Sequence, residues 1–410
     1  MSVISVNFAE VRKPKSLSAP RAIESLNLSY IPGLDGLRGV AIIGVMLYHY
    51  GRTAGGYLGV DIFFTISGFL ITGLLLREWE TKQKVDLWFF YKRRALRLFP
   101  ALWVLVLASG LYEISLHRAC PAVMPFTERA FYALTYFSNW IWALSDNYWN
   151  PLCSFYALWS LAVEEQFYLF WPPILVWFLY RGASMRSVTL TLCTLLAGSI
   201  GAKIYLWAYG ATMWRLAIGT DSRSAPILVG CLAAIAAFSL PSTFWQARRH
   251  VLFIAAPMAF LTLLLLMTNL SDSAQPIYFL PFDISVGMLT AFVIFGITVC
   301  RVPVLTILLE SSTLGYIGKI SYGLYLWHTT VGSYVDVHFP TTPFVLELSL
   351  VLIFTLGSYY YVERPCLRMK ERLTGSSLQA AAPNSLSLKI PTKLTKTGIT
   401  PKSKIIPSSV

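Results

Sequence analysis

The stretch IPGLDGLRGVAIIGVMLYHY (residues 31–50) holds an uncharged apolar run, Gly39–Tyr48, between an arginine, Arg38, and a histidine, His49. Apolar runs of similar length recur along the whole 410-residue chain, of which 56% is hydrophobic and only 13% charged. In ordinary soluble domains about a quarter of the residues are charged. The composition therefore excludes a soluble globular domain and predicts a chain that folds in a bilayer.

Eleven apolar stretches are long enough to be considered as spanning helices. They are residues 33–50, 57–76, 99–117, 127–145, 157–178, 187–208, 225–240, 251–269, 279–299, 316–334 and 343–361. The weakest is 127–145, because it opens with Thr127-Glu128-Arg129 and contains Ser138-Asn139. We interpret it as a re-entrant or interfacial helix. The predicted fold class is all-α, a polytopic transmembrane helix bundle of about ten spanning helices plus this one.

The net charge of +13 is unevenly distributed. After Pro365, eight Lys or Arg residues accompany one acidic residue, Glu371, and most other basic residues lie in short loops. Lys and Arg stay on the cytoplasmic side, so this pattern predicts a multi-pass protein of the cell (inner) membrane with both termini cytoplasmic, and no nucleic-acid partner. We expect a cytoplasmic N-terminal segment (1–30), a transmembrane domain (31–366) and a basic, disordered tail (367–410).

The six cysteines show no metal-ligand spacing, and we predict no metal site. Cys120 and Cys153 fall in the polar stretch that we expect outside the cell. They could form a disulfide there or remain free thiols, and the sequence does not decide between the two. The first 30 residues contain no apolar signal-peptide core, so no cleaved signal is expected.

Arg38 and His49 lie eleven residues apart, which in an α-helix is about 16 Å and within about 20° of three full turns. Both therefore share one face, with Arg38 near the cytoplasmic end and His49 near the outer end. They could be a topology anchor and an interfacial residue. A neutral imidazole facing a polar cavity is, alternatively, a suitable general base.

The segment FYKRRALRLFP (90–100) concentrates Arg93, Arg94 and Arg97 just before a predicted span. Such clusters commonly set topology. Their guanidinium forks also suit phosphate binding.

The segment WSLAVEEQFYLFWP (159–172) places two carboxylates inside a predicted span, where each ionisable group costs about 2.5–3.5 kcal/mol. Helix phase puts Glu164 on one face with Ser160 and Tyr168, and Glu165 on another. Glu164 is therefore the better candidate for a polar interior. Its distance from the outer end of the span predicts the same depth as His49.

The loop GTDSRSAPILVG (219–230) contains Asp221 and Arg223, which we interpret as a salt-bridged pair at the outer interface. Asp61 and His328 are further polar residues in or near spans. His328 could equally be a packed histidine bonded to a neighbouring hydroxyl.

Taken in order, these motifs resemble the membrane acyltransferase 3 family of bacterial O-acyltransferases, which modify surface polysaccharides and related molecules. The resemblance runs from about Ile31 to Pro365. It rests on the pair Arg38 and His49, GVDIFFTISGFLI (59–71), FYKRRALRLFP (90–100), WSLAVEEQFYLFWP (159–172), TDSRSAPILVGCLAA (220–234), GYIGKISYGLYLWH (315–328) and VERP (362–365). It implies about ten helices, a cytoplasmic acyl-CoA donor and an acceptor at the outer face.

Two departures from the family pattern stand out. Ala225-Pro226 replaces an acidic residue that many relatives carry after the arginine, which weakens the case for an acceptor contact there. Many relatives also append a soluble hydrolase-like domain, whereas only about 45 residues follow VERP here, so no second catalytic module is expected.

The resemblance implies a set of roles. Arg93, Arg94 and Arg97, with Lys92, would hold the phosphates of acyl-CoA, with acetyl-CoA as the default donor, and Arg38 would guide its pantetheine arm. His49 would act as general base or be transiently acylated, with Glu164 fixing its tautomer. On the side of a carbohydrate or glycolipid acceptor we expect Asp61, Tyr168, Asp221 and Arg223.

The alternative is a polytopic transporter in which the buried Arg, His and Glu residues line a path for a lipid-linked or anionic substrate. The sequence shows no inverted repeat that would favour it. It predicts neither the acceptor nor the oligomeric state.

Overall fold

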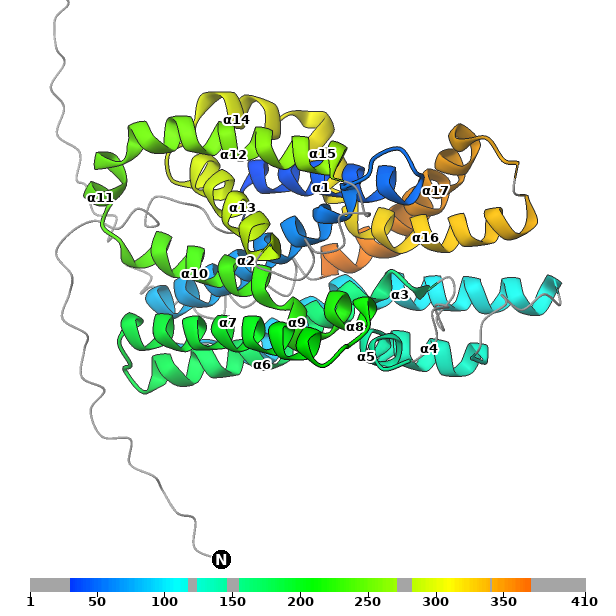
Figure 1. The fold of residues 1–410 in the computed structure, drawn as a ribbon, viewed down its shortest axis with the longest axis horizontal. Coiled ribbons are helices and arrows are strands. Elements are labelled where there is room, and N and C mark those ends of the chain that lie inside the picture. Colours follow the sequence, from blue (N-terminus) through cyan, green and yellow to red (C-terminus); the bar gives the residue numbers. More distant parts are fainter. Residues whose placement is uncertain (1–29, 117–123, 146–154, 271–281, 340, 370–410) are drawn as a thin grey trace, which may run out of the picture. The chain divides into compact units, whose positions relative to one another are not determined.

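The computed structural model describes residues 30–116, 124–145, 155–270, 282–339 and 341–369, and every regular element in these ranges is a helix (Figure 1). The predicted all-α class is confirmed over them. The contacts analysed below lie within Met1–Leu367, the first of two units of the chain. The predicted N-terminal segment and tail, together with Cys120 and Cys153, fall outside the described residues, apart from a few residues at their edges.

Within each described range, neighbouring helices are separated by only a few residues. The first half contains α1 (Pro32–His49), η1 (Gly56–Leu58), α2 (Gly59–Lys82), α3 (Leu87–Leu116), α4 (Phe126–Leu134), α5 (Ser138–Ala143), α6 (Leu158–Tyr180), α7 (Met185–Ala208), α8 (Met213–Ile218), α9 (Thr220–Arg223) and α10 (Ala225–Ser239). The second half contains α11 (Ser242–Ala247), α12 (Arg249–Asn269), α13 (Phe282–Thr298), α14 (Pro303–Leu309), α15 (Ser312–Lys319), α16 (Ser321–His338), α17 (Phe344–Ser358) and η4 (Tyr359–Glu363).

Five of the described helices are long and apolar enough to cross a membrane: α2 with η1, α3, α7, α12 and the helix that begins at Phe344. The pair α13 and α14 would be a sixth if it forms one span bent by 94°. At 15 residues α10 is about 22 Å long, shorter than a hydrocarbon core of about 30 Å. The multi-pass class is thus supported, and the count of ten spans stays a prediction.

The stretch 127–145, expected to be re-entrant or interfacial, is divided between α4 and α5. Tyr136, between them, adopts a left-handed conformation with φ 55°. Neither helix is long enough to span a bilayer as a helix.

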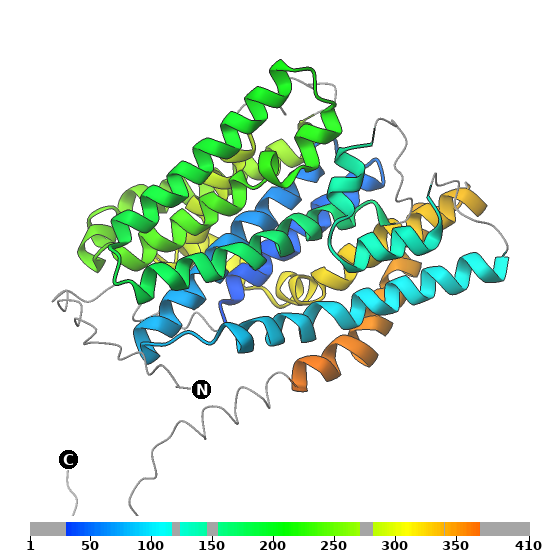
Figure 2. The same ribbon diagram turned by 90° about the horizontal axis from the view of Figure 1, so that it is seen from below.

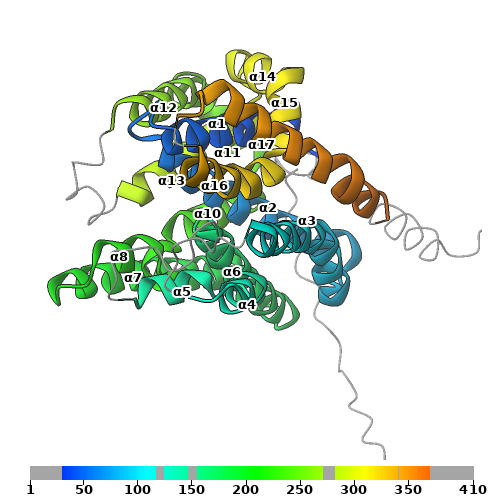
Figure 3. The same cartoon turned by 90° about the vertical axis from the view of Figure 1, so that its right-hand side faces the viewer.

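Helix α2 occupies the middle of the bundle. Figures 1 and 3 place α2 and α10 between a group that includes α1, α12 and α15 and a group that includes α6 and α7. The most apolar window of α2 is 78% buried within the protein, against 22% for α7, so α7 presents most of its surface to lipid. Along another side of the bundle, α3 runs beside α16 and η4 (Figure 2).

Glycines allow the central helices to approach backbone to backbone. A Cβ at Gly68 of α2 would overlap the carbonyl oxygen of Ile227 on α10, and one at Gly230 of α10 would overlap that of Thr65 on α2. The crossing of α1 with α15 is built in the same way, because a Cβ at Gly318 would overlap the carbonyl oxygen of Asp35. Small residues at helix crossings are how membrane bundles gain packing contacts without a hydrophobic driving force.

The ends of α1 fix where its two functional candidates lie. Pro32 begins the helix, with φ already suited to the first helical position. At the other end Gly51, at φ 65°, donates to the Tyr48 carbonyl, and Arg52 donates to the Leu47 carbonyl. This glycine-capped termination makes His49 the last helical residue.

We predict that Gly318→Ala destabilises the protein by about 1–3 kcal/mol, because the added methyl group must push α15 away from α1. Gly315→Ala is the matched control on the same helix, since a Cβ there meets open space. It should be neutral or slightly stabilising, because alanine favours the helix. Thermal unfolding in detergent measures both, and equal midpoints for the two variants would contradict the close-packing argument.

Candidate active site

A cavity of about 110 Å³ lies between α1, α2, α3, α6 and α16. Its polar lining gathers side chains from motifs that are far apart in the sequence. They are Arg38, Ser67, Arg94, Arg97, Ser160, Glu164, Tyr168, Ser321, Tyr322 and Tyr325. Ser160, Glu164 and Tyr168 line it together, as the helical repeat of α6 predicts.

Two prolines in α6 create the attachment of α3. Pro172 and Pro173 lack the N–H groups that would otherwise bond to the carbonyls of Tyr168 and Leu169. The Tyr91 hydroxyl of α3 lies within hydrogen-bonding distance of both carbonyl oxygens, at 3.2 and 3.1 Å. This contact satisfies groups that would otherwise be unpaired, and it holds the arginine-bearing turn of α3 against α6.

Arg94 follows Tyr91 by three residues, and its positive charge is balanced by a carboxylate of α6. Its guanidinium donates to Glu165 Oε1 at 2.7 Å and lies 3.5 Å from the centre of the Tyr168 ring. Glu165 is thus the ionic partner of Arg94. It lies on a different face of α6 from Glu164, and no role was predicted for it from the sequence. Arg38 is likewise paired, with Asp35 one turn earlier at 3.1 Å.

The other basic residues of the 90–100 motif lie in different places. Arg97 lines the cavity, is exposed, and makes no ion pair with any residue the structure describes. Arg93 lies over the Phe89 ring with Glu78 at 3.9 Å, and is not among the cavity-lining residues. Lys92 is exposed. Only two of the three predicted phosphate-binding arginines therefore share the cavity.

Glu164 accepts a hydrogen bond of 2.6 Å from Ser67 Oγ of α2. It lines the same cavity as Arg38, whereas His49 does not. Among the described residues Glu164 makes no hydrogen bond to His49, so the contact through which Glu164 was predicted to fix the tautomer of His49 is not present. The partners of this turn of α6 come instead from α2 and from α3, which begins at Leu87, twelve residues before the predicted span.

His49 instead has a histidine as its ring neighbour. Its Nδ1 lies 2.9 Å from the Val45 carbonyl oxygen and 3.3 Å from Nε2 of His328. A carbonyl oxygen only accepts, so in the neutral imidazole Nδ1 of His49 carries the proton and Nε2 keeps its lone pair. The side chain is exposed, and Nε2 has no hydrogen-bond partner among the described residues. His49 thus has the form that a general base or nucleophile requires.

The predicted pair of Asp221 with Arg223 does not form. Asp221 accepts two hydrogen bonds from Arg215, at 2.8 and 2.6 Å, at the protein surface. Arg223 reaches into the bundle and pairs with Asp61 at 2.9 Å. Asp221 and Arg223 do not pair because both lie in α9, a four-residue helix that directs the two side chains apart.

Asp61 and Arg223 belong to a buried cluster of four charges. Arg223 also lies 3.8 Å from Asp283, which accepts a hydrogen bond of 2.6 Å from Lys203. All four side chains are buried, and their charges balance. The cluster therefore joins α2, α7, α9 and α13 without a net charge in the bundle.

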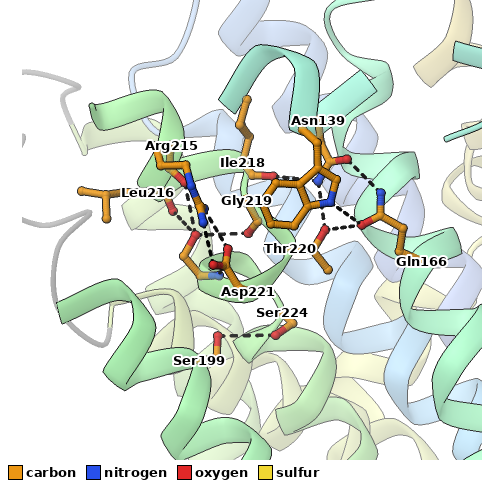
Figure 4. A network of polar contacts seen from close by, with 12 residues as sticks. Asn139, Gln166, Ser199, Arg215, Leu216, Ile218, Gly219, Thr220, Asp221 and Ser224 are labelled. Atoms are coloured by element: carbon orange, nitrogen blue, oxygen red, sulfur yellow. Dashed lines mark hydrogen bonds and ion pairs between the residues drawn. The ribbon is translucent and has the colours of Figure 1, made fainter. Parts of the chain in front are cut away.

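A hydrogen-bond network holds α9 in place (Figure 4). Asn139 of α5 donates to the Ile218 carbonyl at 3.2 Å and to Thr220 Oγ1 at 2.9 Å. Gln166 of α6 donates to Asn139 Oδ1 at 2.9 Å and accepts from Thr220. The predicted acceptor residues thus divide: Asp221 is at the surface, Asp61 and Arg223 are buried, and Tyr168 lies beneath Arg94.

The contacts of Tyr91, Glu165 and His328 were not predicted from the sequence, and only the contact of Tyr91 has a sequence feature that points to it. Pro172-Pro173 within an apolar run marks freed carbonyls, which is the one feature that points to Tyr91. The partnerships of Glu165 and His328 depend on helix packing alone. Among the described residues, no three His, Cys, Asp or Glu side chains cluster as metal ligands.

Comparison with known proteins identifies the motifs as a set. The profile of the acyltransferase domain family matches residues 31–363. The chain is 36% identical over 349 residues to O-acetyltransferase OatA of Staphylococcus aureus strain NCTC 8325, and equally to OatA of strain COL. Each match covers 82% of this chain and 57% of the relative, so the chain spans little more than half the length of these relatives. No solved structure matches the chain.

We predict that Asp61→Asn lowers the free energy of unfolding by about 3–5 kcal/mol, because it leaves Arg223 buried with less than its full counter-charge. Asp221→Asn should cost about 1 kcal/mol or less, since the Asp221 side chain is 40% exposed. Unfolding in detergent compares the two. An Asp61→Asn protein of normal stability would instead favour the acceptor-side role predicted for Asp61.

Proposed function

This chain belongs to the membrane acyltransferase 3 family, and on that premise we propose that it is an O-acyltransferase that moves an acetyl group from acetyl-CoA to a hydroxyl of a surface carbohydrate or glycolipid. The observation that carries the proposal is the chemical state of His49. Its Nδ1–H is committed to a backbone carbonyl, while Nε2 is bare on an exposed ring at the end of α1.

The arginines support a donor site toward the other end of α1. Arg97 offers an uncompensated guanidinium at the cavity, where it would bind a phosphate bidentately. The cavity is small beside the 300–1,000 Å³ typical of ligand sites, so the donor would place only a slender part inside and leave its nucleotide outside. About 16 Å of helix separates Arg38 from His49, which suits the long, thin pantetheine arm of an acyl-CoA.

In direct transfer, His49 Nε2 takes the proton of the acceptor hydroxyl while the hydroxyl oxygen attacks the thioester carbonyl carbon. The C–S bond then breaks, and the CoA thiolate receives the proton from His49. In the relay alternative, Nε2 attacks the carbonyl carbon first, the C–S bond breaks to release the CoA thiolate, and His49 becomes an acyl-imidazolium. The acceptor oxygen then attacks the acyl carbon, the C–N bond breaks to restore His49, and the hydroxyl proton passes to the CoA thiolate. Both routes need the same bare Nε2.

The remaining predicted residues acquire narrower roles. Arg94 and Tyr168 would build the donor cavity, Glu164 would keep its wall polar, and Lys92 and Arg93 would attract the nucleotide from outside it. Asp221 with Arg215 would border the acceptor entrance, while Asp61 and Arg223 would hold α9 beneath it. The positive-inside distribution supports a cytoplasmic donor side and cytoplasmic termini in the inner membrane.

We predict that His49→Ala lowers transfer at least about 100-fold, the usual contribution of a general base, while the protein accumulates normally. His250→Ala is the control, because His250 is an exposed histidine at the start of α12. Membranes are incubated with labelled acetyl-CoA and an extracted surface-glycan fraction, and covalently bound label is counted. Undiminished labelling by His49→Ala would sink the assignment of His49, and labelling by neither variant nor wild type would favour the transporter reading.

We predict that Arg97→Lys raises the KM for acetyl-CoA about tenfold or more, because lysine keeps the charge but loses the bidentate fork. Arg97 has no ionic partner in the described structure to leave stranded, so the fold should tolerate the change. Arg93→Lys, outside the cavity, should change KM less than about twofold. Equal KM values for the two variants would show that position within the cavity does not matter.

A further inference from the structure

His328 lies on α16, is only 1% exposed, and directs Nδ1 at two backbone carbonyls. The Tyr325 and Leu324 oxygens lie 2.8 and 3.1 Å from this atom. Because carbonyls only accept, Nδ1 of His328 carries the proton and Nε2 bears a lone pair. That buried lone pair needs a donor, and its contact in the structure is Nδ1 of His49 at 3.3 Å.

The two ring assignments are mutually consistent. Val45 requires a proton on Nδ1 of His49, and Nε2 of His328 is an acceptor beside it. The opposite tautomers would place a lone pair of each histidine against a carbonyl oxygen, which is repulsive. The backbone of α1 and α16 thus sets the protonation pattern of both rings.

We propose that His328 is a positioning residue for His49: its Nε2 accepts the longer arm, at 3.3 Å, of a three-centre hydrogen bond in which Nδ1–H of His49 also donates to the Val45 carbonyl at 2.9 Å. This contact helps to keep Nε2 of His49 bare and supports the imidazolium that forms when it takes a proton. This inference rests on the proposed function of His49. It gives to His328 the task that the family resemblance implies for Glu164, and that a carboxylate performs in the hydrolase triads.

The position of His328 is independently constrained. On the same helix, the Tyr322 hydroxyl donates to the Leu98 carbonyl of α3 at 2.8 Å, and the Tyr325 hydroxyl donates to the Ala157 carbonyl at 2.9 Å. These bonds fix the register of α16 against α3 and the start of α6. His328 follows Tyr325 by three residues, so it is held opposite His49 by helix geometry.

A neutral partner suits this location. The titratable side chains whose rings face the pair are Tyr48, Tyr156 and Tyr325, and no carboxylate contacts either histidine among the described residues. A carboxylate would bring a buried charge in the resting state, whereas an imidazole supplies an acceptor without one. The pair therefore carries a charge only while His49 holds the transferred proton.

The test compares His328→Phe, which fills the ring volume without an acceptor, with His328→Gln, whose amide oxygen can accept from His49. We expect His328→Phe to lower kcat about tenfold or more, with the KM for acetyl-CoA within twofold of wild type. His328→Gln should recover most of this loss. The control is Thr330→Val, a buried substitution two residues further along α16, which should leave kcat unchanged.

A second measurement, the chemical modification of His49, requires no acceptor substrate. Diethyl pyrocarbonate attacks a bare histidine nitrogen, and His49 is exposed while His328 is buried. Carbethoxylation of His49, followed by mass spectrometry, should slow in His328→Phe and recover in His328→Gln. This measurement remains usable if one variant is too unstable for assays of turnover.

The outcomes separate the two proposals. An inactive His49→Ala together with a fully active His328→Phe overturns the role of His328 and leaves that of His49. A His328→Gln protein as slow as His328→Phe, at equal protein level, also overturns it, because packing rather than hydrogen bonding would then be at work. A fully active His49→Ala overturns the proposed function itself.

Discussion

Polar groups inside a membrane-spanning bundle must find partners within the protein, and one turn of α6 meets this requirement in three directions at once. Glu164, Glu165 and Gln166 are consecutive, so their side chains leave the helix about 100° apart. Glu164 accepts from Ser67 of α2, Glu165 pairs with Arg94 of α3, and Gln166 bonds to the segments around α5 and α9. This single turn therefore ties α6 to two of the helices that enclose the cavity, α2 and α3, and to the network around α5 and α9.

Features that depend on one helix at a time were predictable from the sequence. The shared face of Ser160, Glu164 and Tyr168 follows from the helical repeat, and so does the separation of Arg38 from His49 along α1. The existence of the helices follows from apolar runs, although the start of α3 does not. Its arginine-rich first turns precede the apolar run that predicts the span, and in the structure they extend the same helix, where Tyr91, Arg93 and Arg94 all find partners.

Features that depend on two helices were not predictable, because proximity in sequence is a poor guide to ionic partners. Asp221 and Arg223 are two residues apart, yet Arg223 pairs with Asp61, 162 residues away. His328 and His49 are separated by 279 residues, and no periodicity links them. In each case the partner comes from another helix, and for Asp61 and Arg223 the close crossing of α2 with α10 at Gly68 and Gly230 lies beside the pair.

The balance of charge along α1 bears on what the bundle can admit. Near the N-terminal end of α1, Arg38 and Arg94 are already paired, so an entering anion would have to compete with Asp35 and Glu165 for them. Of the described arginines that line the cavity, only Arg97 has no ion pair, and it is exposed, so an anion entering the proposed donor site would stop there. A neutral chain could continue past the paired arginines without breaking an ion pair. At the far end the two histidines are neutral in the tautomers that their carbonyl neighbours impose. The proposed site, which would hold anions at one end and remain uncharged at the other, suits a donor whose phosphates are charged and whose reacting thioester is not.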